Sequence, residues 1–168
     1  MPSRRTARCR VDCCAAGGAE SVSLAMSRAE REAFLGATHV AIVRIAEEGR
    51  GPLAVPVWYR YEPGGEVRFA TGDVSRKARL LKRAGRASLC VQTETAPYQY
   101  VSVEGPTIIE TIDFERDIRE MALRYLGPRM GEAYLAATYP EGTTSEVIVR
   151  LRPERWWSAD FRKLRVGT

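Results

Sequence analysis

Short runs rich in β-branched and aromatic residues recur along this chain, and most are joined by turn-like segments too short to hold a helix. Antiparallel strands can be joined by tight turns, whereas parallel strands need crossovers of a dozen or more residues. We therefore expect a mainly β, α+β fold with six to seven antiparallel strands, which close best as a barrel. The expected strands span residues 39–46, 53–61, 66–71, 87–93, 98–111 and 146–161, the last run being one or two strands.

Two or three short helices are expected beside these strands. Residues 27–36 begin with a capping serine, and residues 75–84 are followed by a glycine, which is a stop signal for a helix. The segment 113–137 has apolar residues at helical spacing until Gly127 and Pro128 end the run. We expect the last two of these segments to cover openings of the barrel.

The composition excludes several classes of protein. A length of 168 residues with 45% apolar residues indicates one domain with a hydrophobic core. The 26 basic and 21 acidic residues give a net charge of +5, which is compatible with an anionic small ligand or with weak attraction to nucleic acid. His39 is the only histidine, which argues against catalytic triads and histidine-rich metal sites. No apolar run is long enough for a transmembrane helix.

The first part of the sequence differs from the rest. Its basic start resembles a secretion signal, but two acidic residues interrupt the apolar stretch that such a signal needs. Cys9, Cys13 and Cys14 lack a fourth ligand nearby and do not complete a tetrahedral metal site. We expect residues 1–26 to be a disordered N-terminal extension and residues 27–168 to form the folded domain, located in the cytoplasm and without a metal.

Two cations, Arg76 and Lys77, lie in the first turn of the second expected helix, where the helix dipole disfavours positive charge. On a helical wheel, Lys77 falls inside the apolar arc, so its side chain is aimed towards the sheet. These two side chains, the Ser75 hydroxyl and the free backbone N–H groups would together bind a phosphate. The alternative is a solvated basic helix whose lysine extends past the core to water. The geometry favours the phosphate.

The aromatic residues and one proline suggest further contacts. Pro56 indicates an edge strand or a bulge, where backbone groups can face a ligand. Trp58 could stack on a flat ring, or it could be a half-buried core residue. Strand alternation places Trp156 and Trp157 on opposite faces, one in the core and one available for an interface or pocket. Cys90 is interpreted as a small core residue and not as a nucleophile.

From about Met26 to Lys163, the sequence resembles the pyridoxamine 5′-phosphate oxidase-like, FMN-binding split β-barrel proteins. The sharpest match is FATGDVSRKARLL, which is similar to the family's strand–loop–helix segment, where the Arg and Lys hold the cofactor phosphate. The resemblance implies a split β-barrel and a flavin or deazaflavin cofactor. The cofactor-binding residues that it implies by position are Val55, Pro56, Val57, Trp58, Thr71, Ser75, Arg76, Lys77, Gln99, Tyr100 and Trp157.

Two details refine the resemblance. The VSVEG strand is similar to a family segment that reaches into a neighbouring subunit's site, where a glutamine often touches the ring; aligned on Gly105, that position is Tyr100, next to Gln99. The true vitamin oxidases carry an Arg-Leu-His-Asp-Arg-type substrate segment after the late tryptophan, whereas this chain continues with FRKLRVGT. A vitamin-salvage role is therefore not expected. The PVWY pattern and the short length look more like the branch of actinobacterial proteins described as using coenzyme F-420.

The resemblance implies an oxidoreductase that transfers hydride between bound FMN or coenzyme F-420 and a small organic substrate, with the ring supplying the chemistry. It also implies a homodimer with cofactor sites at the interface, and the aromatic-rich strand YQYVSV suggests an apolar face for that contact. A non-catalytic FMN-, haem- or tetrapyrrole-binding sensor of the same fold is the alternative. Nucleic-acid binding is supported only by the basic helix and exposed aromatic residues.

Overall fold

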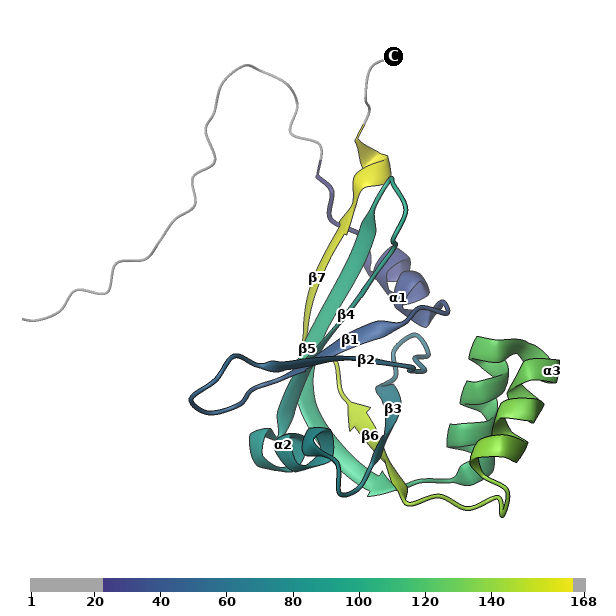
Figure 1. Ribbon diagram of the computed structural model, residues 1–168. Coiled ribbons are helices and arrows are strands. Elements are labelled where there is room, and N and C mark those ends of the chain that lie inside the picture. The colour runs from purple at the N-terminus through teal and green to yellow at the C-terminus, as the bar shows by residue number, and fades with distance from the viewer. Residues whose placement is uncertain (1–22, 165–168) are drawn as a thin grey trace, which may run out of the picture.

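We describe the protein from a computed structural model, in which residues 23–164 are placed (Figure 1). Seven strands form one curled antiparallel sheet in the order β2-β1-β4-β5-β6-β3, and β7 pairs with β5 beside this path. Their bounds are Ala41–Ile45 (β1), Leu53–Val57 (β2), Val67–Gly72 (β3), Arg86–Gln92 (β4), Gln99–Thr111 (β5), Glu146–Leu151 (β6) and Arg155–Asp160 (β7). The expected mainly β, α+β split barrel is confirmed.

The long strand β5 joins the two halves of this split barrel. Its first half pairs with β4 and β7, and its residues from Thr107 to Thr111 pair with β6. Gly105 lies where the strand changes partners, and a Cβ atom at that position would lie 1.8 Å from the carbonyl oxygen of Arg152. Only glycine allows this close approach of two backbones, so Gly105 is required for the junction.

The core lies inside the curled sheet, where alternate residues of each strand point. In β1 and β4 the residues Val43, Leu89 and Val91 are buried, whereas their neighbours in sequence are more exposed. Cys90 is one of those neighbours, and it pairs with Ile42 and Ser102 on the outer face of the sheet. The interpretation of Cys90 as a core residue is therefore wrong, because the strand alternation places it on the opposite side.

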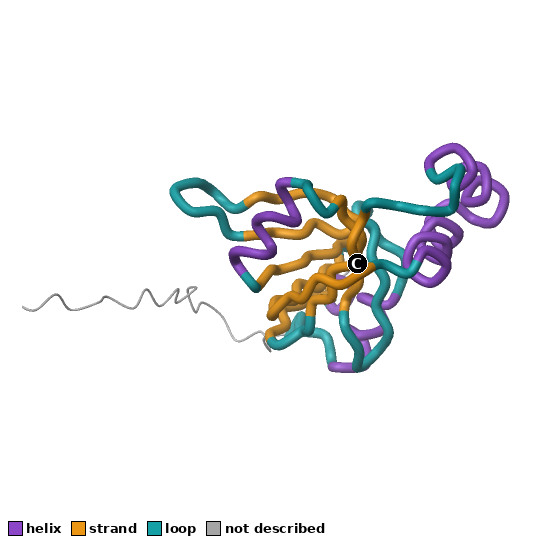
Figure 2. The backbone as a smooth tube through the Cα atoms, turned by 90° about the horizontal axis from the view of Figure 1, so that it is seen from below, coloured by secondary structure: helices purple, strands orange, loops and turns teal. Residues whose placement is uncertain are grey.

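Two short helices begin and end where the sequence indicates. Helix α1 (Arg28–Gly36) has a full capping box between Ser27 and Glu30. Helix α2 (Arg76–Ala84) is capped by Ser75 and ends at Gly85, whose φ of 61° is the left-handed conformation that glycine adopts readily. Figure 2 shows α2 lying across the strands, seen from below.

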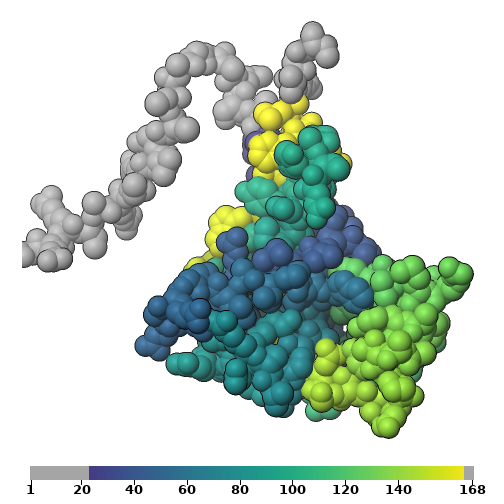
Figure 3. Space-filling model, in the orientation of Figure 1, coloured from purple at the N-terminus to yellow at the C-terminus, as the bar shows by residue number. Residues whose placement is uncertain are grey.

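The third helical segment extends beyond the point where the sequence pattern ends. A π-helical turn, η1 (Phe114–Arg119), leads into α3 (Glu120–Thr138), which is interrupted at Gly127, with a φ of 74°. The helix resumes at Pro128. Proline has no backbone N–H donor, but the first turn of a helix does not use that donor, so a proline fits there. Figure 3 shows α3, in green, as a lobe beside the rest of the molecule.

The expected extension lies mostly in residues 1–22, outside the described residues, together with its three cysteines. The division at Ser27 therefore stays a prediction. The residues just before it contact the domain: the Asp160 amide donates to the Leu24 carbonyl over 2.8 Å, and Met26 is buried. A 3-10 turn, η2 (Phe161–Lys163), follows β7. Among residues 23–164, no helix is long and apolar enough to span a bilayer.

Candidate functional site

A cavity of about 440 Å³ lies between the barrel and the η1–α3 segment. The end of β2 contributes Pro56, Val57 and Trp58, and α2 contributes Lys77. Residues of η1 and α3, together with Ala70 of β3 and Glu146 of β6, complete the lining. Four of the residues implied by the family resemblance therefore line one cavity.

Aromatic rings form one wall of this cavity. The Trp58 ring stacks on Tyr125 of α3, with 4.9 Å between ring centroids and an angle of 9° between planes. Tyr134 lies 5.8 Å from Trp58, and Tyr139 lies 6.1 Å from Tyr134. The sequence left open whether Trp58 is a half-buried core residue or is available to stack on a flat ring. In the structure it is half-buried and also lines the cavity.

Lys77 supplies the positive charge in the cavity. Its side chain is half-buried, its Nζ lies 5.9 Å from the centre of the Phe69 ring, and it forms no ion pair with any residue between 23 and 164. Burial lowers the pKa of Lys77, and the nearby charge of Glu146 raises it in part. The inward direction expected from the helical wheel is confirmed. A half-buried ammonium without a partner attracts an anion.

The remaining residues around the start of α2 have other contacts. The Arg76 guanidinium lies 2.6 Å from the Glu47 carboxylate, in the loop after β1, and does not line the cavity. The Ser75 hydroxyl accepts from the Ala78 amide and lies 3.0 Å from the Thr71 hydroxyl. The structure therefore does not bring the two cations, Arg76 and Lys77, to one point.

Comparison with known proteins was made on sequence and on structure. No family model and no curated protein matches the sequence. A solved structure of a conserved hypothetical protein from Mycobacterium tuberculosis is 25% identical, with a TM-score of 0.72 over 90% of this chain and 95% of that one. An F-420 reductase is 20% identical, with a TM-score of 0.62 over 75% and 94% of the two chains.

A third solved structure, of a protein from Listeria innocua described as a candidate pyridoxamine 5′-phosphate oxidase, is 14% identical, with a TM-score of 0.58 over 78% of this chain and 96% of that one. The chain has the pyridoxamine 5′-phosphate oxidase-like fold. This finding confirms the resemblance that the sequence indicates.

Two of the implied residues lie on the outer face of the split barrel, away from the cavity of their own chain. Trp157 is 49% exposed and pairs with Ser102, while Trp156 packs on the core as strand alternation predicts. Tyr100 is partly exposed on the same face, whereas Gln99, at the start of β5, has the orientation of the buried Val101 and does not line the cavity. Val55 packs against the core and does not line the cavity.

A row of paired residues crosses this outer face from edge to edge. The row runs through Pro56, Ile42, Cys90, Ser102 and Trp157, each opposite the next on a neighbouring strand. Strand β2 is an edge strand, as its proline predicts. Because Pro56 also lines the cavity, the row connects the outer face to the site.

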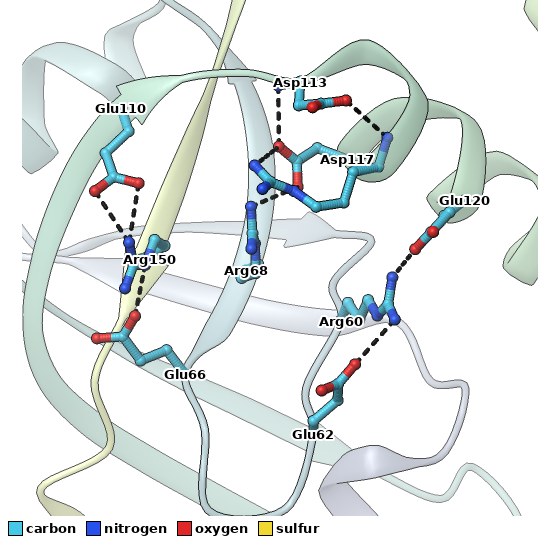
Figure 4. A network of polar contacts seen from close by, with 10 residues as sticks. Arg60, Glu62, Glu66, Arg68, Glu110, Asp113, Asp117, Glu120 and Arg150 are labelled. Atoms are coloured by element: carbon cyan, nitrogen blue, oxygen red, sulfur yellow. Dashed lines mark hydrogen bonds and ion pairs between the residues drawn. The ribbon is translucent and has the colours of Figure 1, made fainter.

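A network of ion pairs holds the η1–α3 segment against the split barrel (Figure 4). Arg68 of β3 donates to the Asp117 carboxylate over 2.6 Å, and Arg60 pairs with Glu120. Burial by itself would raise the pKa of Asp117, but hydrogen bonds from Arg116 and from the backbone, and the Arg68 charge, together lower it. Asp117 lines both the aromatic cavity and a second, charged cavity next to it.

Several residues of the site were not identified from the sequence. Glu146 and Tyr139 line the cavity, and the Tyr139 hydroxyl donates to Glu146 Oε2 over 2.8 Å. Burial, followed by the hydrogen bond to Glu146 and its charge, raises the pKa of Tyr139, so the tyrosine stays protonated. Tyr134 and Asp117 were missed as well. The helical spacing placed Ile118 and Met121 on one face but could not show what that face covers.

Proposed function

We propose that this protein binds a flavin or deazaflavin, FMN or coenzyme F-420, in the aromatic cavity and transfers hydride between it and a small organic substrate. The observation that carries the proposal is the half-buried Lys77 ammonium, which has no ion pair among the described residues and faces a cavity with an aromatic wall. A volume of about 440 Å³ is in the usual range for ligand sites.

The residues present fit such a cofactor. Lys77 and the N-terminal amides of α2 would hold the phosphate, with the positive end of the helix dipole adding to the attraction. Trp58, Pro56 and Val57 would border the ring. The bound ring itself accepts and donates hydride, so the chain needs no histidine for the reaction. The fold shared with an F-420 reductase supports this proposal.

The same proposal includes a homodimer with cofactor sites at its interface. The outer face exposes large apolar side chains, with Ile42 at 38% and Trp157 at 49%. An apolar face of this kind is typical of a protein interface. A partner that covers the row from Pro56 to Trp157 would border the cavity, because Pro56 belongs to both. Tyr100 and Trp157 would then approach the partner's cofactor, with Gln99 next to Tyr100 at the start of β5.

The test combines a spectrum with a titration. The absorbance spectrum of the purified protein distinguishes bound FMN, deazaflavin and haem. Lys77→Ala should weaken cofactor binding by about 1.5–3 kcal/mol, or roughly ten- to a hundredfold in Kd, because one charge-assisted contact is lost. Arg86→Ala is the control, since Arg86 lies beyond the far end of α2 and pairs with Glu154. Equal weakening by both variants, fading with salt, would indicate diffuse attraction instead.

A further inference from the structure

Lys77 shares its end of the cavity with a carboxylate. Glu146 is the first residue of β6 and pairs with Gly72, the last residue of β3, just ahead of α2. Both Lys77 and Glu146 line the cavity, and the charge of Glu146 acts on the Lys77 ammonium. The two groups do not form a direct ion pair. An anion that approaches Lys77 therefore also approaches a negative charge.

The Glu146 carboxylate accepts hydrogen bonds from two hydroxyl groups. The Tyr139 hydroxyl donates to Glu146 Oε2 over 2.8 Å, and the Thr144 hydroxyl lies 3.4 Å from the same oxygen. Because both contacts use Oε2, the Oε1 atom has no hydrogen bond among the described residues.

The neighbouring charges do not offset Glu146. Arg76 is paired with Glu47, so its charge is already balanced outside the cavity. Asp117, the other carboxylate that lines the cavity, is balanced by Arg68 and Arg116. Among residues 23–164, Lys77 and Glu146 are thus the two charges left at this end, and their formal sum is zero.

We propose that Glu146 is a specificity-determining residue that makes the Lys77 end of the cavity select a singly charged phosphodiester over a doubly charged phosphate monoester. The inference rests on the proposed function, in which Lys77 holds the cofactor phosphate. At neutral pH a phosphate monoester carries a charge of about −1.5 to −2, whereas a diester carries about −1. The extra negative charge of the monoester is attracted by Lys77 and repelled by Glu146, so the two effects oppose each other. The more highly charged phosphate also loses more of its hydration on entering the cavity.

The consequence is a choice between the two cofactors. FMN ends in a phosphate monoester, and coenzyme F-420 carries its phosphate as a diester. A phosphate bound at Lys77 and the Glu146 carboxylate are both negatively charged, and like charges in one partly dry site repel each other. We expect the site to prefer the diester by roughly tenfold in Kd. Coenzyme F-420 is therefore the favoured cofactor of this chain.

The sharpest probe is a pair of ligands that differ in one charge. FMN and its phosphate methyl ester have the same ring and the same hydroxylated chain, but the methyl ester is a diester. Both are titrated into the full-length protein and into Glu146→Gln, which keeps the side-chain size and an acceptor for Tyr139. The unchanged protein should bind the methyl ester about tenfold more tightly, and Glu146→Gln should bring the ratio of the two Kd values close to one.

Control proteins separate a local charge from a general or structural effect. Glu48→Gln removes the same charge at an exposed position outside the cavity and should leave the ratio unchanged. Tyr139→Phe keeps the carboxylate and should preserve the preference for the diester. Riboflavin, which has no phosphate, should bind to the unchanged protein and to Glu146→Gln within about twofold, whereas a structural role of Glu146 would weaken all three ligands alike.

The outcomes are distinguishable. An equal affinity for FMN and its methyl ester in the unchanged protein, or a ratio that Glu146→Gln does not alter, overturns the inference while Lys77→Ala still tests the phosphate site. If neither FMN, its methyl ester nor coenzyme F-420 binds, the proposed function fails and the inference fails with it. Melting curves of each variant show whether it is folded, and Glu146→Asp offers a second change that keeps the charge and should keep the preference.

Discussion

Nineteen buried residues form one continuous core inside the barrel, whereas the core beneath η1 and α3 has three among the described residues: Ile118, Ala122 and Leu135. The helical segment depends instead on ion pairs such as Arg68 with Asp117, and on the stacking of Tyr125 on Trp58. The barrel is thus held by apolar burial, and the segment that covers the cavity is held mainly by directional contacts.

This difference indicates that the barrel is the more stable part and that the η1–α3 segment opens more easily. Stability that comes from apolar burial depends little on pH or on the loss of a single polar group, because it is spread over many residues. A segment held by a few polar contacts opens at lower cost, as is common for elements that cover a binding site. The barrel therefore fixes the positions of Lys77 and Trp58, and the η1–α3 segment closes the cavity over them.

The comparison is tested most directly by the same substitution in the two cores. Leu89→Ala in β4 removes a side chain that is 0% exposed and should destabilise the protein by about 4 kcal/mol. Leu135→Ala in α3 should cost about 2 kcal/mol, because the small core around it can collapse more easily. Denaturant unfolding measures both, and equal losses would show that the two cores form one cooperative unit.

Asp117→Asn should remove about 2 kcal/mol of stability at neutral pH, because Arg68 and Arg116 lose a charged partner. The native pKa of Asp117 lies below its ordinary value, so its contribution is complete above about pH 4 and is lost as the pH falls through the lowered pKa. The difference between the two proteins should therefore shrink on acidification. A difference that stays constant down to about pH 2 would contradict this assignment.

The smallest effect is expected at the contact between α3 and the end of β2. The Tyr125 hydroxyl donates to the His39 carbonyl over 2.6 Å and accepts from the Tyr59 amide over 3.0 Å. Tyr125→Phe keeps the stacking on Trp58 but should speed hydrogen exchange at the Tyr59 amide by about tenfold, a change of roughly 1.4 kcal/mol. The Leu89 amide should be unaffected, and Tyr98→Phe, at an exposed position, is the matched control.

The sequence alone predicted the barrel and the inward direction of Lys77. Strand alternation predicted that Trp156 and Trp157 lie on opposite faces, the proline predicted that β2 is an edge strand, and the helical wheel predicted that Lys77 points inward. These features depend on local periodicity, which a chain displays before it folds. Alternation alone did not settle the position of Cys90. Its neighbours Leu89 and Val91 are apolar as well, and only the strand pairing fixes which set faces inward.

Only the tertiary structure decided which charges meet. Glu146 lies near Lys77 because β6 pairs with β3 across a separation of about seventy residues, and Arg76 turns away because the loop after β1 presents Glu47. Ion pairs and cavity walls join residues that are distant in the sequence, and no local pattern records such pairings. The sequence thus determined that Lys77 points inward. The pairing of β6 with β3 determined that the Glu146 carboxylate lies near it.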